Sequence, residues 1–351
     1  MQAFVTGATG LLGNNLVRAL EADGHRVRAL VRSVDKARAL LGDTSAELVA
    51  GDMADVAGFA DALHGCDAVF HTAAYFREYF REYYRAGRHW PQFEAINVRG
   101  AEALAGAALA RGVRRFIDTS TSALIGVTDD GRPGDESTPP AALAYENLYV
   151  KSKLLAAERL LDLTARTDLE VVQVLPGWMF GPRDAGPTAS GRLVRDFLAQ
   201  ALPGTPPGGT NVVDARDVAR GMIRAAERGR RGERYILGGA FATLQDVMQG
   251  LARASGLPAP RRRIPYPAAL AYAMFAQTWA RLTGGETLIS VASVHIMRAE
   301  IRVSSAKAER ELDWRPRPLL ATLRDEVAWY RAHDAAATVM DGRPATSGAA
   351  R

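Results

Sequence analysis

The chain has 351 residues, of which 48% are hydrophobic and 24% are charged. This composition excludes a mainly disordered chain and is typical of a globular protein. Because a single hydrophobic core stops growing near roughly 250–300 residues, the length predicts one large domain with a smaller lobe. The net charge of +5 is spread over short basic runs without an aromatic stacking pattern, so we expect no nucleic-acid partner.

The few cysteines and histidines exclude other classes of site. The one cysteine, Cys66, cannot form an intrachain disulfide or a Cys-rich zinc site, and the six histidines show no metal-ligand spacing. We therefore expect no metal. The first residues are typical of a strand and lack the features of a signal peptide, which predicts a cytoplasmic location.

The most apolar stretch, Tyr266 to Trp279, is shorter than a bilayer span. It predicts a buried or lid helix rather than an integral membrane segment, with peripheral membrane contact as the alternative.

Short β-type runs alternate with helical patterns over the first 180 residues. This alternation predicts a parallel, doubly wound α/β sheet, the Rossmann fold, over residues 1–180. We expect helices from Leu12, over about 92–110 and over about 148–166. The expected strands are 3–6, 27–31, 47–50, 68–71, from 115 and 171–175.

The pattern changes after Pro176. Proline and glycine cluster at 181–187 and 203–209, and the later segments are mostly helical. We expect a smaller, mostly helical substrate lobe over 181–334, with about 210–240 contributing to the first domain and a flexible tail over 335–351. The expected elements here are helices at about 188–201, 217–228, 243–254 and 318–333, and a short β run at 235–237.

A glycine-rich turn joins the first strand to the first helix, with the sequence Thr6-Gly7-Ala8-Thr9-Gly10-Leu11-Leu12-Gly13. The first glycine permits a tight turn, the second lets the backbone approach a pyrophosphate, and the third allows close helix–sheet packing. The helix N-terminus offers free N–H groups to phosphates. The motif therefore predicts a dinucleotide cofactor that contacts Gly7, Thr9, Gly10, Leu11, Leu12 and Gly13.

The end of the second strand bears on which cofactor is bound. An acidic residue there normally holds the NAD ribose, whereas an arginine accommodates the NADP phosphate. The chain has Arg32 and Ser33 at this point, Lys36 close by, and no carboxylate. This favours NADP(H) over NAD(H), with a solvated Arg32 as the alternative.

Tyr149 and Lys153 lie four residues apart in an expected helix, and so on one face of it. A lysine ammonium one turn away favours the phenolate form of a tyrosine. The pair can then exchange a proton with a substrate oxygen while a nicotinamide exchanges hydride. Four hydroxyl residues, 119–122, follow the fifth strand, and one of them can bond the reacting oxygen.

Together these motifs resemble the extended short-chain dehydrogenases/reductases, the superfamily of nucleotide-sugar epimerases, dihydroflavonol reductases and 3β-hydroxysteroid dehydrogenases. The resemblance runs from residue 1 to about 332. It rests on the glycine-rich turn, Gly51-Asp52, His71-Thr72-Ala73-Ala74, Asn97, Tyr149 with Lys153, and Gly181-Pro182. Within it, the sequences at 231–239 and 304–308 resemble the dihydroflavonol-reductase-like branch, which includes bacterial proteins labelled hopanoid-associated sugar epimerases.

This resemblance implies roles for single residues. The catalytic hydroxyl sits five residues before a glycine, which selects Thr121 before Gly126, with Ser122 second. Lys153 would also bond the nicotinamide ribose, and the family is expected to form homodimers. The residues implied to border the cofactor, together with Pro176 at the end of the sixth strand, are Asp52, Met53, Ala73 and Ala74.

Hydride transfer between NAD(P)(H) and a secondary alcohol or ketone is the predicted reaction. Nucleotide-sugar enzymes of the family usually carry an asparagine before Gly-Pro, and 174–182 contains none. Trp178, Met179 and Phe180 suit a partly apolar small-molecule substrate, or else pack in the core. An epimerase or dehydratase of nucleotide sugars is the alternative, followed by a non-catalytic cofactor-binding protein.

The segment 75–85 alternates aromatic and charged residues after the fourth strand. It predicts a short helical lid over the substrate, or equally a helix packed on the second lobe or a partner subunit. If the segment is a lid, replacing Tyr79 and Tyr83 by alanine should lower the affinity of the protein for its substrate.

Overall fold

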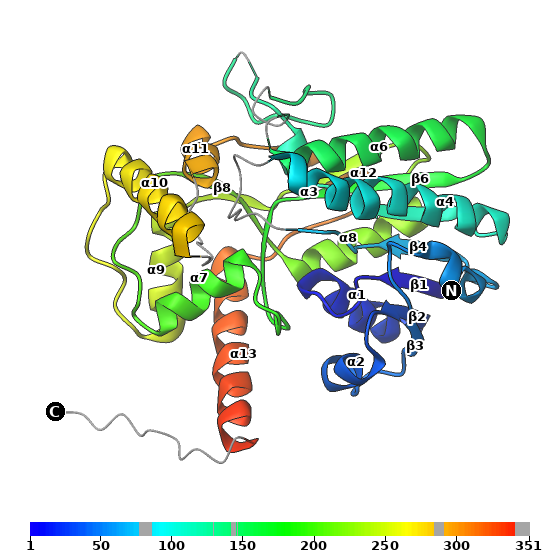
Figure 1. Cartoon of the computed structure of the whole chain (residues 1–351), viewed down its shortest axis with the longest axis horizontal. Helices are drawn as coiled ribbons and strands as arrows, with labels where there is room; N and C mark the ends of the chain where they lie inside the picture. Colours follow the sequence, from blue (N-terminus) through cyan, green and yellow to red (C-terminus); the bar gives the residue numbers. More distant parts are fainter. Residues whose placement is uncertain (77–85, 129, 142–144, 146, 284–290, 341–351) are drawn as a thin grey trace.

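A computed structural model describes the chain except for residues 77–85, 129, 142–144, 146, 284–290 and 341–351. Seven parallel strands form the central sheet (Figure 1), which confirms the predicted Rossmann fold. Their order places β1 and β4 at the centre, where the chain reverses direction across the sheet. The order is β3 (Glu47–Ala50), β2 (Arg26–Val31), β1 (Gln2–Thr6), β4 (Ala68–His71), β5 (Arg115–Thr119), β6 (Glu170–Pro176) and β9 (Arg234–Leu237).

The sheet is buried on both faces because its side chains alternate between two cores. In β1, Ala3 and Val5 join a core with α1 (Leu11–Ala22), α2 (Val34–Leu41) and α8 (Ala215–Arg228). Phe4 joins the opposite core, with α4 (Gly100–Ala110) and α6 (Leu148–Arg166). Near-continuous apolar strands are expected where helices cover both faces of a parallel sheet.

One predicted helix is longer and less regular than expected. The helix expected over 92–110 begins earlier, as α3 (Ala86–Phe93), and passes through a π-helical segment, η4 (Glu94–Arg99), before α4. Pro91 lies inside α3, where it lacks the N–H that a regular α-helix needs. π-helical turns occur frequently at functional sites, and this one contains Asn97. Among the described residues, three short 3-10 segments were not predicted: η1 (Val56–Gly58), η2 (Ala60–Leu63) and η5 (Ser122–Leu124).

The second lobe contains a small sheet that the sequence patterns did not predict. Its order is β10 (Ala240–Thr243), β8 (Gly209–Asp214) and β7 (Trp178–Phe180). Helices α7 (Ala189–Leu198), α9 (Leu244–Ser255) and α13 (Leu319–Met340) contribute to a separate hydrophobic core beside it. Helix α12 (Ala306–Glu311) instead packs against β9 of the large sheet. Helix α13 continues past residue 335, where we expected the tail to begin.

Helix α10 (Tyr266–Thr283) covers the apolar stretch for which the sequence predicted a buried or lid helix. It lies at the outer edge of the lobe with α11 (Val291–Ala299), at the end of the molecule opposite the N-terminal strands (Figure 1). Several of its large apolar side chains are exposed, so of the predicted buried or lid helix the buried alternative is wrong. None of the helices in the described part of the chain has the length and apolar character needed to cross a membrane.

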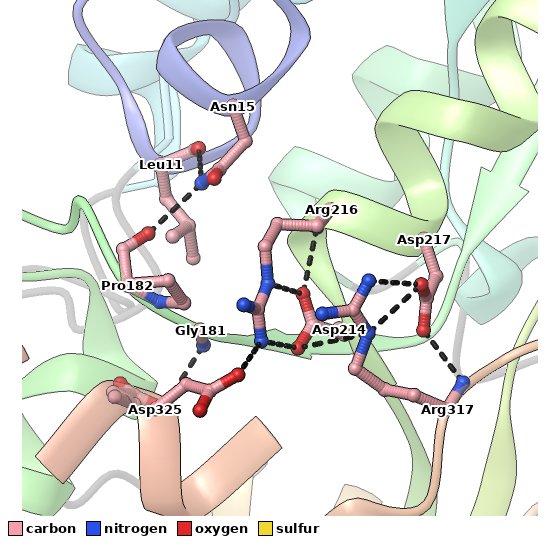
Figure 2. Close-up of polar contacts among 10 residues, drawn as sticks. Leu11, Asn15, Gly181, Pro182, Asp214, Arg216, Asp217, Arg317 and Asp325 are labelled. Atoms are coloured by element: carbon pink, nitrogen blue, oxygen red, sulfur yellow. Dashed lines mark hydrogen bonds and ion pairs between the residues drawn. The ribbon is translucent and has the colours of Figure 1, made fainter. Parts of the chain in front are cut away.

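An ion-pair network around the buried Asp214 joins the two lobes (Figure 2). Asp214, at the end of β8, accepts bonds from Arg216 Nε at 3.0 Å and Nη2 at 2.7 Å, and its Oδ2 lies 3.6 Å from Nε of Arg317. Arg216 also binds Asp325 of α13 at 2.7 Å, and Arg317 binds Asp217 of α8 at 2.8 Å. The network therefore fixes α13 against the first turn of α8.

The same region ties the second lobe to the start of α1. Nδ2 of Asn15 donates to the carbonyls of Leu11, at 2.8 Å, and Pro182, at 2.9 Å (Figure 2). The N–H of Gly181 donates to Oε2 of Glu326 at 2.9 Å. The Gly181-Pro182 segment is thereby held beside the N-terminus of α1, next to the glycine-rich turn.

Candidate active site

The glycine-rich turn has the shape that a dinucleotide cradle requires. Gly7 has a φ of +68°, and a Cβ there would lie 2.8 Å from the backbone nitrogen of Ala73. At Gly13 a Cβ would lie 2.1 Å from the carbonyl oxygen of Gly7, so only glycine lets α1 pack this closely. Gly10 is exposed and caps α1 without a side-chain bond. No side chain therefore competes at Gly10 for the N-terminal N–H groups of α1, the groups with which a helix start binds phosphate.

The end of β4 is fastened to this turn. Oγ1 of Thr6 accepts bonds from the N–H groups of Thr72 and Ala73, both at 3.2 Å. The hydroxyl of Thr72 donates to the carbonyl of Thr6 at 2.6 Å. Ala73 and the next residue, Ala74, are partly exposed, and the bond from Ala73 to Thr6 brings this segment next to the turn.

Lys153 is buried on α6 with only 4% of its surface exposed. Its Nζ donates to the carbonyl of Thr119, at the end of β5, at 2.7 Å. An ammonium has three donors, and in the described part of the chain this is the one acceptor that Lys153 reaches. Two N–H donors therefore remain for a bound molecule, because burial removes them from water.

Tyr149 lies one turn before Lys153 at the start of α6. Its ring packs against the cluster that contains Leu124 and Ile125, and edge-on against Phe76 with the ring centres 4.6 Å apart. Asn147 caps the helix by accepting from the N–H groups of Tyr149, at 3.0 Å, and Val150, at 3.2 Å. The helix start, and with it Tyr149, is thus fixed by a side-chain cap.

A second asparagine connects α6 to the loop after β4. Asn97 accepts from the N–H of Tyr75 at 2.7 Å and donates to the carbonyl of Tyr75 at 3.0 Å. Its Nδ2 also donates to the hydroxyl of Ser152 at 2.9 Å. The π-helical segment thus holds Tyr75 beside α6. Tyr79 and Tyr83 of the expected lid lie outside the described residues.

A buried polar row crosses the sheet beneath α6. The four neighbouring strands β1, β4, β5 and β6 each have a buried apolar residue that faces α4 and α6. Two residues further along each strand, the residue is polar, and these four polar residues lie opposite one another across the sheet. All are buried: Thr6, His71, Asp118 and Gln173. Oγ1 of Thr6 lies 2.9 Å from Nδ1 of His71, and Nε2 of Gln173 donates to Asp118 at 3.4 Å.

The charge of Lys153 and the groups of this row shift one another's pKa values. Burial lowers the pKa of Lys153, and the negative charge of Asp118 opposes that shift. Burial likewise raises the pKa of Asp118, against the attraction of Lys153. The pKa of His71 is lowered to about 3, first by burial and second by the positive charge of Lys153. His71 is therefore neutral near pH 7. We had not predicted Asp118 as a site residue, although the polar residue at each strand end is visible in the sequence.

The hydroxyls after β5 are in different environments. Oγ1 of Thr121 accepts from the N–H of Ala123 at 3.2 Å, which leaves its own hydrogen available to a substrate oxygen. Ser120 is buried, and its hydroxyl has no hydrogen-bond partner among the described residues. Thr119 donates to the sulfur of Met222 at 3.7 Å. Thr121 and Ser122 are partly exposed, so both remain candidates.

The remaining predicted cofactor residues follow the edge of the sheet. Arg32 is exposed just after β2, and no other group in the described chain bonds its side chain. Asp52 is exposed after β3, Met53 is buried in the core, and Pro176 ends β6 opposite Leu237 of β9. Pro176 thus lies at the carboxyl edge of the sheet, where ligands bind in open α/β folds.

We expect Asp118→Asn to move the alkaline limit of activity to lower pH. The substitution keeps the shape but removes the charge that favours the ammonium form of Lys153, so the pKa of Lys153 falls further. The measurement is kcat/KM against pH for any substrate the enzyme turns over. Asp61→Asn, which changes an exposed carboxylate, is the matched control. An unchanged alkaline limb in Asp118→Asn would show that Asp118 does not act on Lys153.

Comparisons with known proteins agree with this geometry. The profile of the NAD dependent epimerase/dehydratase family matches residues 3–238. The chain belongs to this family. The glycine-rich turn, Tyr149 and Lys153 all lie within the matched residues, and the resemblance to extended short-chain dehydrogenases/reductases is confirmed. The protein is therefore an NAD(P)-dependent enzyme of the extended type.

Individual relatives extend over nearly the whole chain. A putative dihydroflavonol 4-reductase of Synechocystis sp. is 32% identical, over 94% of this chain and 94% of its own. Sterol demethylase protein B of Methylococcus capsulatus is 32% identical, over 94% and 98%. The crystal structure of a nucleoside-diphosphate-sugar epimerase from Pseudomonas aeruginosa is 27% identical with a TM-score of 0.76, over 95% and 98%.

Proposed function

We propose that this enzyme transfers hydride between NADP(H) and a secondary alcohol or ketone carbon of an apolar substrate. The observation that carries the proposal is the buried Lys153, which keeps two N–H donors for a ligand at the carboxyl edge of the sheet. Tyr149 lies one turn away on the same helix, where an acid–base group would stand.

Each residue of the site has a separate role in this proposal. A bound nicotinamide would supply or accept the hydride. Tyr149 gives a proton to the substrate oxygen in reduction and removes it in oxidation. Lys153 holds a ribose through its free donors and favours the phenolate of Tyr149 by its charge. The hydroxyl of Thr121 donates a hydrogen bond to the same substrate oxygen, with Ser122 as the second candidate.

The end of β2 supports NADP(H) over NAD(H) within this proposal. The exposed guanidinium of Arg32 can form charge-assisted bonds with a ribose phosphate. The hydroxyl of Ser33 already accepts from the N–H of Lys36 at 3.4 Å as the cap of α2, so Arg32 is the better candidate.

We expect Arg32→Ala to weaken NADPH binding by about 10- to 100-fold, since a hydrogen bond to a charged group contributes about 1.5–3 kcal/mol. NADH binding should not change. Fluorescence titration of the purified protein with each cofactor measures both. Arg26→Ala, at the other end of β2, removes an equal charge and should leave both affinities as they are. Equal losses for NADPH and NADH in Arg32→Ala would assign Arg32 no role in cofactor choice.

The apolar substrate is inferred from the site and from the relatives. Phe76 lies edge-on to Tyr149 and is 45% exposed, so it borders the space where a substrate must meet the acid–base group. Phe180 is instead fully buried in the core of the second lobe, which assigns it to packing. Two relatives are named for a flavonoid reduction and a sterol demethylation. A panel of sterol and flavonoid ketones, followed by NADPH oxidation, tests this class.

An epimerase or dehydratase of nucleotide sugars is the second candidate, favoured by the sugar-epimerase structure that shares the fold at 27% identity. Such an enzyme recycles its NAD internally, so protein that purifies with unexchangeable NAD would support it and overturn the reductase. The proposal also includes a cytoplasmic homodimer. Sedimentation velocity of the purified protein tests the dimer.

A further inference from the structure

On helix α10 the small side chains face the protein and the large apolar side chains face solvent, the reverse of the usual arrangement. The side that packs onto the protein carries mostly alanines: Ala269, Ala273 and Ala280, with Gln277. The opposite side carries large apolar groups that are exposed to solvent. Phe275 is 63% exposed, Trp279 59% and Leu282 80%, with Tyr272 next to them on the same face. Spacings of three and four residues make this a single stripe along a helix about 27 Å long.

This stripe is unusual for the molecule as a whole. Eight large hydrophobic residues are exposed in the described part of the chain, and five of them belong to α10. The helix contains no acidic residue, and its sequence has one basic residue, Arg281. Contiguous exposed apolar surface of this kind marks a docking site for another molecule or for a membrane.

Positive charge gathers at the N-terminal end of the same helix. Arg261, Arg262 and Arg263 are exposed just before α10, and none of the three has an ion-pair partner in the described chain. Arg298 of α11 lies over the ring of Tyr266 at 4.0 Å, at the first turn of α10. Between residues 258 and 303 the sequence has six arginines and two glutamates, so most of the net charge of +5 belongs to this segment.

The positions of these arginines are fixed by the backbone. Thr205 pairs with Arg263, and its N–H donates to the carbonyl of Arg262 at 2.9 Å. The hydroxyl of Tyr266 lies 2.9 Å from Nδ1 of His295, which ties the start of α10 to α11. Figure 1 places α10 and the segment that leads into it along the outer edge of the lobe. None of these residues belongs to the candidate cofactor site.

We propose that the exposed face of α10, with the arginines at its N-terminal end, is a docking surface for an anionic lipid membrane. A helix with Trp, Phe and Leu on one side and arginines beside it lies in the plane of the interface, with its apolar face at the boundary of head groups and acyl chains. The arginines attract lipid phosphates, because anionic surfaces bind clustered basic residues. The enzyme is then a peripheral protein, and this conclusion does not depend on which substrate it reduces.

Vesicle co-sedimentation of the full-length protein tests the proposal. We expect binding to vesicles of phosphatidylcholine and phosphatidylglycerol in equal parts, and little binding to phosphatidylcholine alone or at high salt. Phe275→Ser with Trp279→Ser should lower the bound fraction at least about tenfold, since apolar burial drives interfacial binding. Val127→Ser, at another exposed apolar residue, is the matched control. The same loss of binding is expected when Arg261, Arg262 and Arg263 are changed together to glutamine. As a matched control, changing the exposed Arg26, Arg253 and Arg324 to glutamine should leave the bound fraction unchanged.

A spectroscopic measurement places the contact on α10. The emission of wild-type protein should shift to the blue on vesicles, and Trp279→Phe should remove that shift while the bound fraction stays the same. Absence of vesicle binding, or binding that the α10 variants do not change, overturns the proposal. It is also overturned if Phe275→Ser with Trp279→Ser converts a dimer to a monomer in sedimentation velocity without affecting vesicle binding, because the face is then a protein interface.

Discussion

Replacing Tyr149 by phenylalanine should lower kcat/KM by about 10²- to 10⁴-fold, the usual contribution of a positioned acid–base group. The variant removes only the hydroxyl that exchanges a proton with the substrate. The ring contacts with Phe76 and with the Leu124 and Ile125 cluster can all be made by phenylalanine, so the fold and the helix cap at Asn147 should persist. Steady-state kinetics, with NADPH affinity measured alongside, separates the chemical step from cofactor binding.

The control is Tyr145→Phe, four residues earlier, where the side chain is 53% exposed. It removes the same atom and should leave kcat/KM unchanged. A Tyr149→Phe enzyme within a factor of about 10 of wild type would assign the proton transfer to another group, because general acid–base catalysis contributes at least that much. Loss of NADPH affinity in the same variant would instead indicate that Tyr149 holds the cofactor.

The parts of the fold that the sequence predicts are those that depend on local rules. The glycine-rich turn needs a positive φ at Gly7 and no side chain at Gly13, and these requirements are met by residues that are neighbours in the chain. The six strands of the first domain were expected within one residue of their observed limits, because apolar runs between turns are typical of a buried parallel sheet. Helix α6 begins and ends where its pattern predicts.

The parts that sequence patterns missed depend on contacts between distant segments. Strands β7 and β10 have three and four residues, and each becomes a strand only because β8 lies between them. The burial of Asp118 follows from its register with His71 on one side and Gln173 on the other. The exposure of α10 could not be predicted because an apolar helix has the same sequence signature whether a protein or a lipid covers it.

Replacing Asp214 by alanine should lower the free energy of unfolding by about 3–5 kcal/mol, the effect of removing one partner of a buried ion pair. The Asp214 side chain is fully buried and lies against two guanidinium groups, those of Arg216 and Arg317. It also caps α8 by accepting from the N–H of Arg216 at 2.8 Å. The variant therefore leaves two arginines short of a counter-charge and a helix start without its cap (Figure 2).

Asp325→Ala is the matched control, because Asp325 binds the same Arg216 at 2.7 Å but is half-exposed. An exposed ion pair contributes about 0–1 kcal/mol, so the control should change unfolding little. Urea denaturation measures both variants. Equal effects would show that the charge of Asp214 is as well solvated as that of Asp325. A large effect of Asp214→Ala alone would show that burial gives this carboxylate its role. The ion pairs that join α13 to the first turn of α8 would then be organised around this one buried carboxylate.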